Sequence, residues 1–206
     1  MSGIKLTFKN KSNDSNNSKV YFFQQNIVAS LSELPIAWKV IENCGRGDTN
    51  TFDFPDELQV GVTDSYNNVT PLLDAAPGQA FEVVRDKSGD VLQTLDDATS
   101  KTEVQINNNM AKGAFVGGIY KAGKLLAQKT GVYPQSMAAF EFKPSIWVGA
   151  GSQVVEGEVM NSAVLSQSNK QIVLEGIASA SIVMYGGGAG ATAQALTFEL
   201  EDVVYL

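Results

Sequence analysis

The stretch that decides the fold of this chain is FEFKPSIWVGAG, residues Phe140–Gly151. Phe140 and Phe142 alternate with charged residues, which is typical of a β-strand with one buried face. Pro144 interrupts this pattern, β-branched and aromatic residues resume it, and closely spaced glycines end it. Because proline cannot donate a ladder hydrogen bond, we expect a corner at a sheet edge or bulge, with both phenylalanines pointing inward and the charged residues outward.

Similar short runs recur along the rest of the chain at spacings of about 8–12 residues, with turn signals between them. They number about a dozen, and little of the sequence has the periodicity of a helix. A chain of 206 residues is long enough to bury a core without disulfides. We see no linker and no fixed-period repeat. The sequence therefore predicts an all-β fold, a single β-sandwich domain over residues 1–206, jelly-roll-like or related.

The first and last strand-like segments carry opposite charges on their polar faces. Lys5 and Lys9 alternate with apolar residues near the start, and Glu199 and Glu201 do so near the end. Opposite charges on neighbouring strands stabilise a sheet by a few tenths of a kcal/mol per pair. We therefore expect the terminal strands to lie in the same sheet and close together.

Composition excludes several classes of chemistry. The chain has no histidine and a single cysteine, so serine–histidine and cysteine–histidine catalysis and histidine-ligated metal sites are ruled out. Carboxylates remain. An irregular calcium site is one interpretation of Asp53, Asp56, Glu57 and Asp64. A two-carboxylate hydrolase is a distant alternative, for which the acidic turns at residues 53–57 and 96–97 supply the carboxylates. We predict no catalytic residue and no cofactor.

The net charge of −7 disfavours nucleic acid and anionic membranes as partners. No run approaches 18 apolar residues, and the N-terminal sequence lacks an apolar signal core. We expect a cytoplasmic protein without a transmembrane segment, or one exported without an N-terminal signal. Cys44 stands beside Arg46, which would lower the pKa of its thiol. The interpretation we favour is a small residue at a turn, and an intermolecular disulfide through Cys44 is the remaining alternative.

Four aromatic residues are candidates for a ligand or interface surface: Trp38, Tyr66, Tyr133 and Trp147. The loops of β-sandwiches present such side chains to glycans or lipids, so a stacking platform is one interpretation. The other is that both tryptophans belong to the core, and this is the interpretation we favour.

Residues 140–160, FEFKPSIWVGAGSQVVEGEVM, resemble a segment of RhiA-like proteins, and residues 4–10, IKLTFKN, are similar to their opening strand. The resemblance covers about a fifth of the chain, and departs in the middle region and the glycine-rich tail. It implies a soluble, bacterial-type protein, abundant under cell-density control, with no assigned enzymatic activity. It supplies no active-site residues.

The leading hypothesis is a non-enzymatic soluble protein that self-associates, as a homo-oligomer, an inclusion or a crystal-like storage or matrix assembly. The absence of catalytic residues, the few charges and the many Asn, Gln, Ser and Gly residues favour it. The alternative is a β-sandwich module that binds carbohydrate or lipid.

Overall fold

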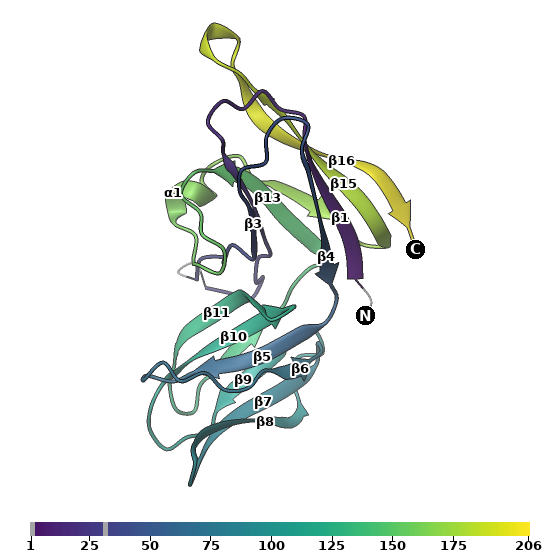
Figure 1. Cartoon of the computed structure of the whole chain (residues 1–206). Coiled ribbons are helices and arrows are strands. Elements are labelled where there is room, and N and C mark those ends of the chain that lie inside the picture. Colours follow the sequence, from purple (N-terminus) through teal and green to yellow (C-terminus); the bar gives the residue numbers. More distant parts are fainter. Residues whose placement is uncertain (1–2, 31–32) are drawn as a thin grey trace. The chain divides into compact units, whose positions relative to one another are not determined.

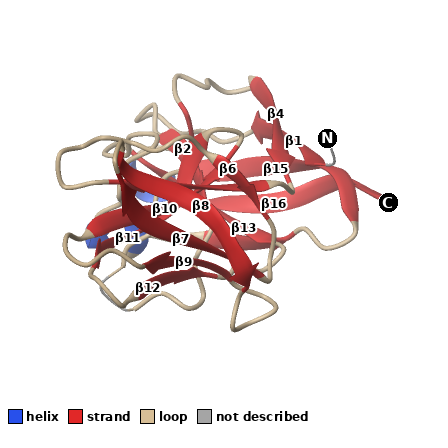
Figure 2. Ribbon diagram, turned by 90° about the horizontal axis from the view of Figure 1, so that it is seen from below, coloured by secondary structure: helices blue, strands red, loops and turns tan. Residues whose placement is uncertain are grey.

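The computed structural model describes residues 3–30 and 33–206, and over these the chain is all-β (Figure 1). Sixteen strands are described, together with a four-residue helix, α1 (Ser162–Leu165), and a short 3-10 turn (Gly190–Thr192). Figure 2 shows strand and loop making up nearly all of the chain. The predicted fold class is therefore confirmed.

The chain divides into two compact units, where the sequence led us to expect one domain. The terminal unit comprises the described residues of Met1–Gln25, Leu34–Asp56 and Pro144–Leu206. The inserted unit comprises those of Asn26–Glu33 and Glu57–Lys143. Each unit contains two four-stranded sheets, which is a sandwich architecture repeated twice.

The terminal unit contains sheets A and B. Sheet A has, in spatial order, β16 (Gln194–Tyr205), β15 (Ile177–Gly187), β1 (Gly3–Asn10) and β4 (Thr49–Pro55). Sheet B has β14 (Lys170–Val173), β13 (Ser145–Gly151), β2 (Lys19–Phe23) and β3 (Lys39–Ile41). Aromatic rings fill the space between the two sheets: Phe8 of β1 meets Phe22 of β2 edge-on, with ring centroids 6.5 Å apart.

The inserted unit contains sheets C and D. Sheet C has β11 (Lys124–Val132), β10 (Phe115–Lys121), β5 (Leu58–Thr63) and β6 (Leu73–Ala75). Sheet D has β12 (Met137–Phe140), β9 (Val104–Asn108), β7 (Gln79–Asp86) and β8 (Gly89–Asp97). The sheets approach closely at Gly117 of β10, where an added Cβ would lie 3.2 Å from Ala138 and 3.4 Å from Ile106.

The two units repeat one strand arrangement. Adding eight to the numbers of β1–β8, and subtracting eight from those of β9–β16, maps sheet A onto sheet D and sheet B onto sheet C. Every pairing keeps its direction, including the parallel pairs β1–β15 and β7–β9. Each sheet therefore takes two strands from each half of the chain. The residues themselves show no such repeat.

The stretch Phe140–Gly151 crosses from one unit to the other. Phe140 ends β12 in the inserted unit and is buried, and Ser145 begins β13 in the terminal unit. Phe142 and Glu141 are both half-buried, so the expected inward and outward alternation stops at Phe140. The reason is that β12 ends there, and the period of two applies only within a strand.

The terminal strands lie in one sheet, as predicted, with β15 between β1 and β16 (Figure 1). The charge pairs differ from those expected. Lys9 pairs with Asp202 at 2.8 Å, and Lys11 pairs with Glu201 at 3.2 Å. Asp202 adopts a left-handed backbone conformation (φ 50°) where the β15–β16 register shifts, and this bulge re-aims the side chains of β16.

Candidate functional site

The two tryptophans lie in the terminal unit. Trp38 is buried and packs against Phe52 and Phe54, with ring centroids 6.2 and 5.2 Å away. Trp147 is half-buried and stacks on Phe23 at 6.0 Å with an interplanar angle of 14°. The burial of Trp38 identifies it as a core residue, and only Trp147 retains partial access to solvent.

The two tyrosines lie in the inserted unit, so the four candidate aromatics do not form one platform. Tyr66 and Tyr133 follow the ends of β5 and β11, and both are exposed, Tyr66 by 82%. Both strand ends meet the start of β10, because Thr63 pairs with Val116 and Val132 with Phe115. The tyrosines are thus carried by one end of sheet C.

The loop that carries Tyr66 is ordered by Asp64. Its carboxylate accepts hydrogen bonds from the backbone N–H groups of Tyr66 (2.8 Å) and Asn68 (2.9 Å) and from Asn68 Nδ2 (2.9 Å). The Asn68 side-chain and backbone bonds lower the pKa of Asp64, chiefly through the side chain. The carboxylate is thus occupied by its own turn, which presents Tyr66 on a defined loop.

The carboxylates considered for calcium are divided between the units. Asp53 and Asp56 belong to the terminal unit, and Glu57 and Asp64 to the inserted unit. Over residues 3–30 and 33–206, no group of three or more Asp, Glu, Cys or His residues is placed to hold a metal ion.

A polar network crosses sheet A and was missed by the sequence analysis. Lys11 Nζ donates to Tyr185 Oη at 3.2 Å and to Glu201, while the Tyr185 hydroxyl donates to Glu201 Oε1 at 2.5 Å. Next to it, Asp202 accepts from Lys9 Nζ and from the Ser181 hydroxyl. Each charge has an opposite partner, so this network is best described as a clamp across β1, β15 and β16.

Hydrogen bonds set the protonation of this network. The bonds from Tyr185 and Lys11 lower the pKa of Glu201, in that order of size. The bonds to Tyr185 and then to Glu201 raise the pKa of Lys11. The Lys9 bond, followed by the Ser181 bond, lowers the pKa of Asp202. All three groups therefore favour their charged forms.

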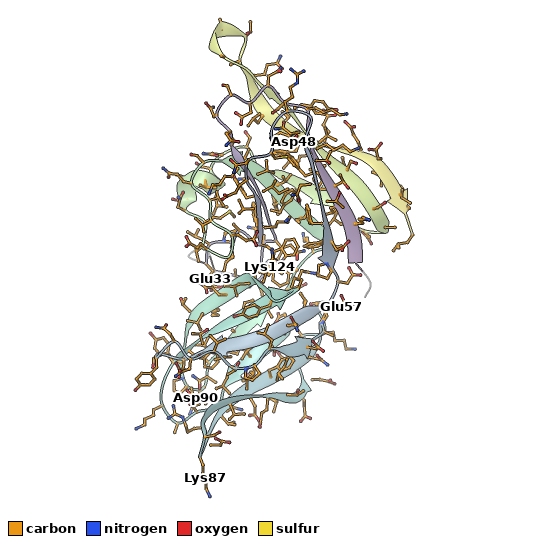
Figure 3. The ribbon with its side chains drawn as sticks, in the orientation of Figure 1. Glu33, Asp48, Glu57, Lys87, Asp90 and Lys124 are labelled. Atoms are coloured by element: carbon orange, nitrogen blue, oxygen red, sulfur yellow. The ribbon has the colours of Figure 1, made fainter. Side chains whose placement is uncertain are left out.

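Cys44 is half-buried in the loop between β3 and β4. The same loop carries Asp48, which is labelled in Figure 3. Burial raises the pKa of its thiol, and the Asp48 carboxylate raises it further. The alternative interpretation, in which Arg46 lowers this pKa, is therefore wrong. The Arg46 guanidinium instead donates to Asn13 Oδ1 at 2.7 Å.

β16 is the longest strand described, and it forms one edge of sheet A. It pairs with β15 and, among the described strands, with no other. Its end is apolar and exposed: Val204 by 55% and Leu206 by 95%, with exposed Tyr205 between them. The signal for this surface was present in the sequence, because the apolar run Val203–Leu206 follows the alternating part of the last strand.

No protein-family model, curated protein or solved structure matches this chain. The RhiA-like resemblance of residues 4–10 and 140–160 therefore stays a prediction. Among the described residues, no helix is long and apolar enough to cross a membrane.

Proposed function

We propose that this protein is non-enzymatic and self-associates, as a homo-oligomer or a larger crystal-like or inclusion-like assembly with a structural or storage role. The observation that carries the proposal is the free edge of β16, which ends in exposed Val204, Tyr205 and Leu206. An edge strand offers unpaired N–H and C=O groups, and a second chain can extend the sheet through them.

The charged residues of β16 do not prevent a second chain from pairing with its C-terminal end. Glu201 and Asp202 pair with lysines of the N-terminal segment, so their repulsion toward an approaching strand is reduced. The last four residues, Val203–Leu206, carry no charged side chain. Burying a large apolar side chain is worth about 1.5–3 kcal/mol, so a few such residues can hold a second copy.

The test is sedimentation velocity of the full chain over a wide range of concentration. The wild-type protein is expected to shift to larger species as concentration rises. Val204→Lys is expected to weaken this shift, because it places a cation on the proposed contact. Val69→Lys is the matched control, since Val69 is similarly exposed (60%) but lies in the inserted unit. Equal effects of the two substitutions would contradict the role of β16.

A carbohydrate-binding surface on the inserted unit is the second candidate. The favouring observation is that exposed Tyr66 and Tyr133 are carried by one end of sheet C, on loops that also contain the amides Asn68 and Gln135. Aromatic rings stack on sugar faces, and amides bond their hydroxyls. Glycan-array binding that is lost in Tyr66→Ala but kept in Val69→Ala would support it. Binding to lipid vesicles alone, or equal loss in both variants, would contradict it.

A further inference from the structure

We infer that copies of this chain join by exchanging residues Pro144–Leu206, so that β13–β16 of one copy complete the terminal unit of another. This segment is called the C-terminal quarter, because it holds four of the sixteen described strands. The partner is a second copy of the same chain. This inference rests on the proposed self-association and describes a second contact between copies, separate from the free edge of β16.

The terminal unit is made from the two ends of the chain. Strands β1–β4, which we call the N-terminal quarter, come from residues before Asp56, and β13–β16, the C-terminal quarter, come from residues after Lys143. Each of its sheets takes two strands from each quarter. Neither quarter therefore has a complete sheet of its own. By contrast, the strands of the inserted unit, β5–β12, follow one another in the chain.

The contact between the quarters is core. Along β1 and β15, buried Leu6 pairs with Ala180 and buried Phe8 with Ile182. Across sheet B, β2 and β13 pair over five positions, from Phe23 with Trp147 to Lys19 with Gly151. A C-terminal quarter that leaves its own chain would expose this surface, so it must pair with an N-terminal quarter, either its own or that of another copy.

The segment whose backbone would have to change conformation for the exchange is short. Glu141 is fixed within the inserted unit, because its N–H donates to Asn26 Oδ1 and its carbonyl accepts from the Ile27 N–H, both at 2.9 Å. Pro144 is fixed within the terminal unit, because its carbonyl accepts from the Leu174 N–H at 2.8 Å. Only Phe142 and Lys143 lie between these anchors. A residue before proline prefers extended backbone, so this connection is both short and stiff.

Exchange requires no new interface. The same residues meet in the same register whether the two quarters belong to one copy or to two, so the contact energies are equal. Concentration then decides the balance, because joining two copies loses translational freedom that a single chain keeps. Reciprocal exchange gives a closed dimer, and one-way exchange gives an open row of copies.

The test is a cysteine pair that reports which chains meet. In a Cys44→Ser background, Lys19→Cys with Gly151→Cys places one thiol in each quarter, on paired residues of β2 and β13. Thr7→Cys with Thr51→Cys is the control, because both belong to the N-terminal quarter and their hydroxyls are 3.0 Å apart. Both proteins are assembled at high concentration, oxidised with diamide, denatured and separated on a non-reducing gel.

Exchange predicts covalent dimers and larger chains for the Lys19–Gly151 pair, and only monomers for the control pair. If the protein sediments as an oligomer but the Lys19–Gly151 pair gives only monomers, the exchange is refuted while self-association stands. If it sediments only as a monomer, both are refuted. Lys5→Cys with Ser179→Cys, across β1 and β15, replaces the first pair if that variant does not fold.

Discussion

Asn10 and Asn108 occupy the same place in the two units, at the ends of β1 and β9, and both are buried. Asn10 Nδ2 donates to the Cys44 carbonyl at 2.7 Å, and Asn108 Nδ2 donates to the Val132 carbonyl at 2.8 Å. In both cases Oδ1 accepts the backbone N–H of the second residue along, at 2.9 and 3.1 Å. The two side-chain amides therefore stabilise, by the same hydrogen bonds, the turns that follow β1 and β9.

The backbone around them matches as well. The Asn10 N–H donates to Asp48 O at 3.0 Å, and the Asn108 N–H donates to Ser136 O at 2.9 Å. Asp48 directly precedes β4, and Ser136 directly precedes β12. The strand β4 pairs with β1 in the same register in which β12 pairs with β9. A buried amide that satisfies several backbone groups is costly to remove, and this explains why an asparagine holds both positions.

Replacing either asparagine by alanine should destabilise the unit that contains it. Asn10→Ala and Asn108→Ala each leave buried backbone groups unsatisfied, so we expect a loss of about 2–4 kcal/mol. Hydrogen exchange followed by mass spectrometry measures this for each unit: Asn10→Ala should act on the terminal unit, and Asn108→Ala on the inserted unit. Exposed Asn16→Ala is the control and should change protection by little. Uniform loss over both units in either variant would argue against independent roles.

Gly149 should not tolerate a side chain. A Cβ there would lie 2.5 Å from the ring of Tyr21 and still closer to Asn169 Oδ1. Both are held, because the Tyr21 hydroxyl donates to Asn169 at 2.8 Å. We expect Gly149→Ala to lower the free energy of unfolding by about 1–3 kcal/mol, as overpacking does in cores.

Gly151→Ala is the matched control for this prediction. Its Cβ would first meet the end of the Gln167 side chain at 3.1 Å, and that side chain can move. Urea denaturation of the two variants should separate them clearly. An equal and small effect at both positions would show that the Tyr21 contact is not constraining.

Acid should weaken the clamp on sheet A. The pKa values of Glu201 and Asp202 are lowered in the folded protein, by their bonds to Tyr185 and Lys11 and to Lys9 and Ser181. Their stabilising contribution is therefore present above the unfolded pKa of about 4 and is lost as the pH falls through the folded value. The urea midpoint of the wild type should fall between about pH 5 and about pH 3.

Glu201→Gln combined with Asp202→Asn should remove part of that pH dependence, and asparagine tolerates the left-handed backbone at 202. Glu199→Gln, on the same strand, is the control for loss of one negative charge. If Glu199→Gln flattens the pH dependence as much as the double variant does, general charge repulsion is responsible and the clamp is not.

The Cys44 thiol should react slowly. Burial and the nearby Asp48 carboxylate raise its pKa, so less thiolate is present near neutral pH. Iodoacetamide labelling of the native protein is expected to be several-fold slower than labelling of the urea-unfolded chain, and Asp48→Asn should speed the native reaction. Rapid native labelling, or abundant dimers linked through Cys44 without added oxidant, would contradict this account.

The fold class could be predicted from local patterns because period-two alternation and turn residues report directly on strands. The paired positions of Leu6 and Phe8 in β1 illustrate this, since both are fully buried. The division into two units could not be predicted, because it depends on which strands pair across long distances. The sequence from β12 to β13 indicates a corner within one domain. In the structure, Phe140 belongs to the inserted unit and Pro144 to the terminal unit.

Some features of the candidate surfaces could be predicted from residue type alone, and others could not, because they depend on residues that are distant in the sequence. Composition alone excludes histidine chemistry, and exposed Tyr66 and Tyr133 are found by residue type. Burial of Trp38 and the raised pKa of Cys44 depend on neighbours that the fold brings from elsewhere, Phe54 and Asp48 among them. The repeated hydrogen-bond pattern of Asn10 and Asn108 has almost no counterpart in the surrounding residues, so only the structure reveals it.

Native mass spectrometry of the full chain over a series of increasing concentrations tests the central claim most directly, because it counts the copies in each particle. Self-association predicts particles with two or more copies, whose share grows with concentration and falls in Val204→Lys. A protein that remains a monomer at every concentration, including the highest at which it stays in solution, would contradict the account.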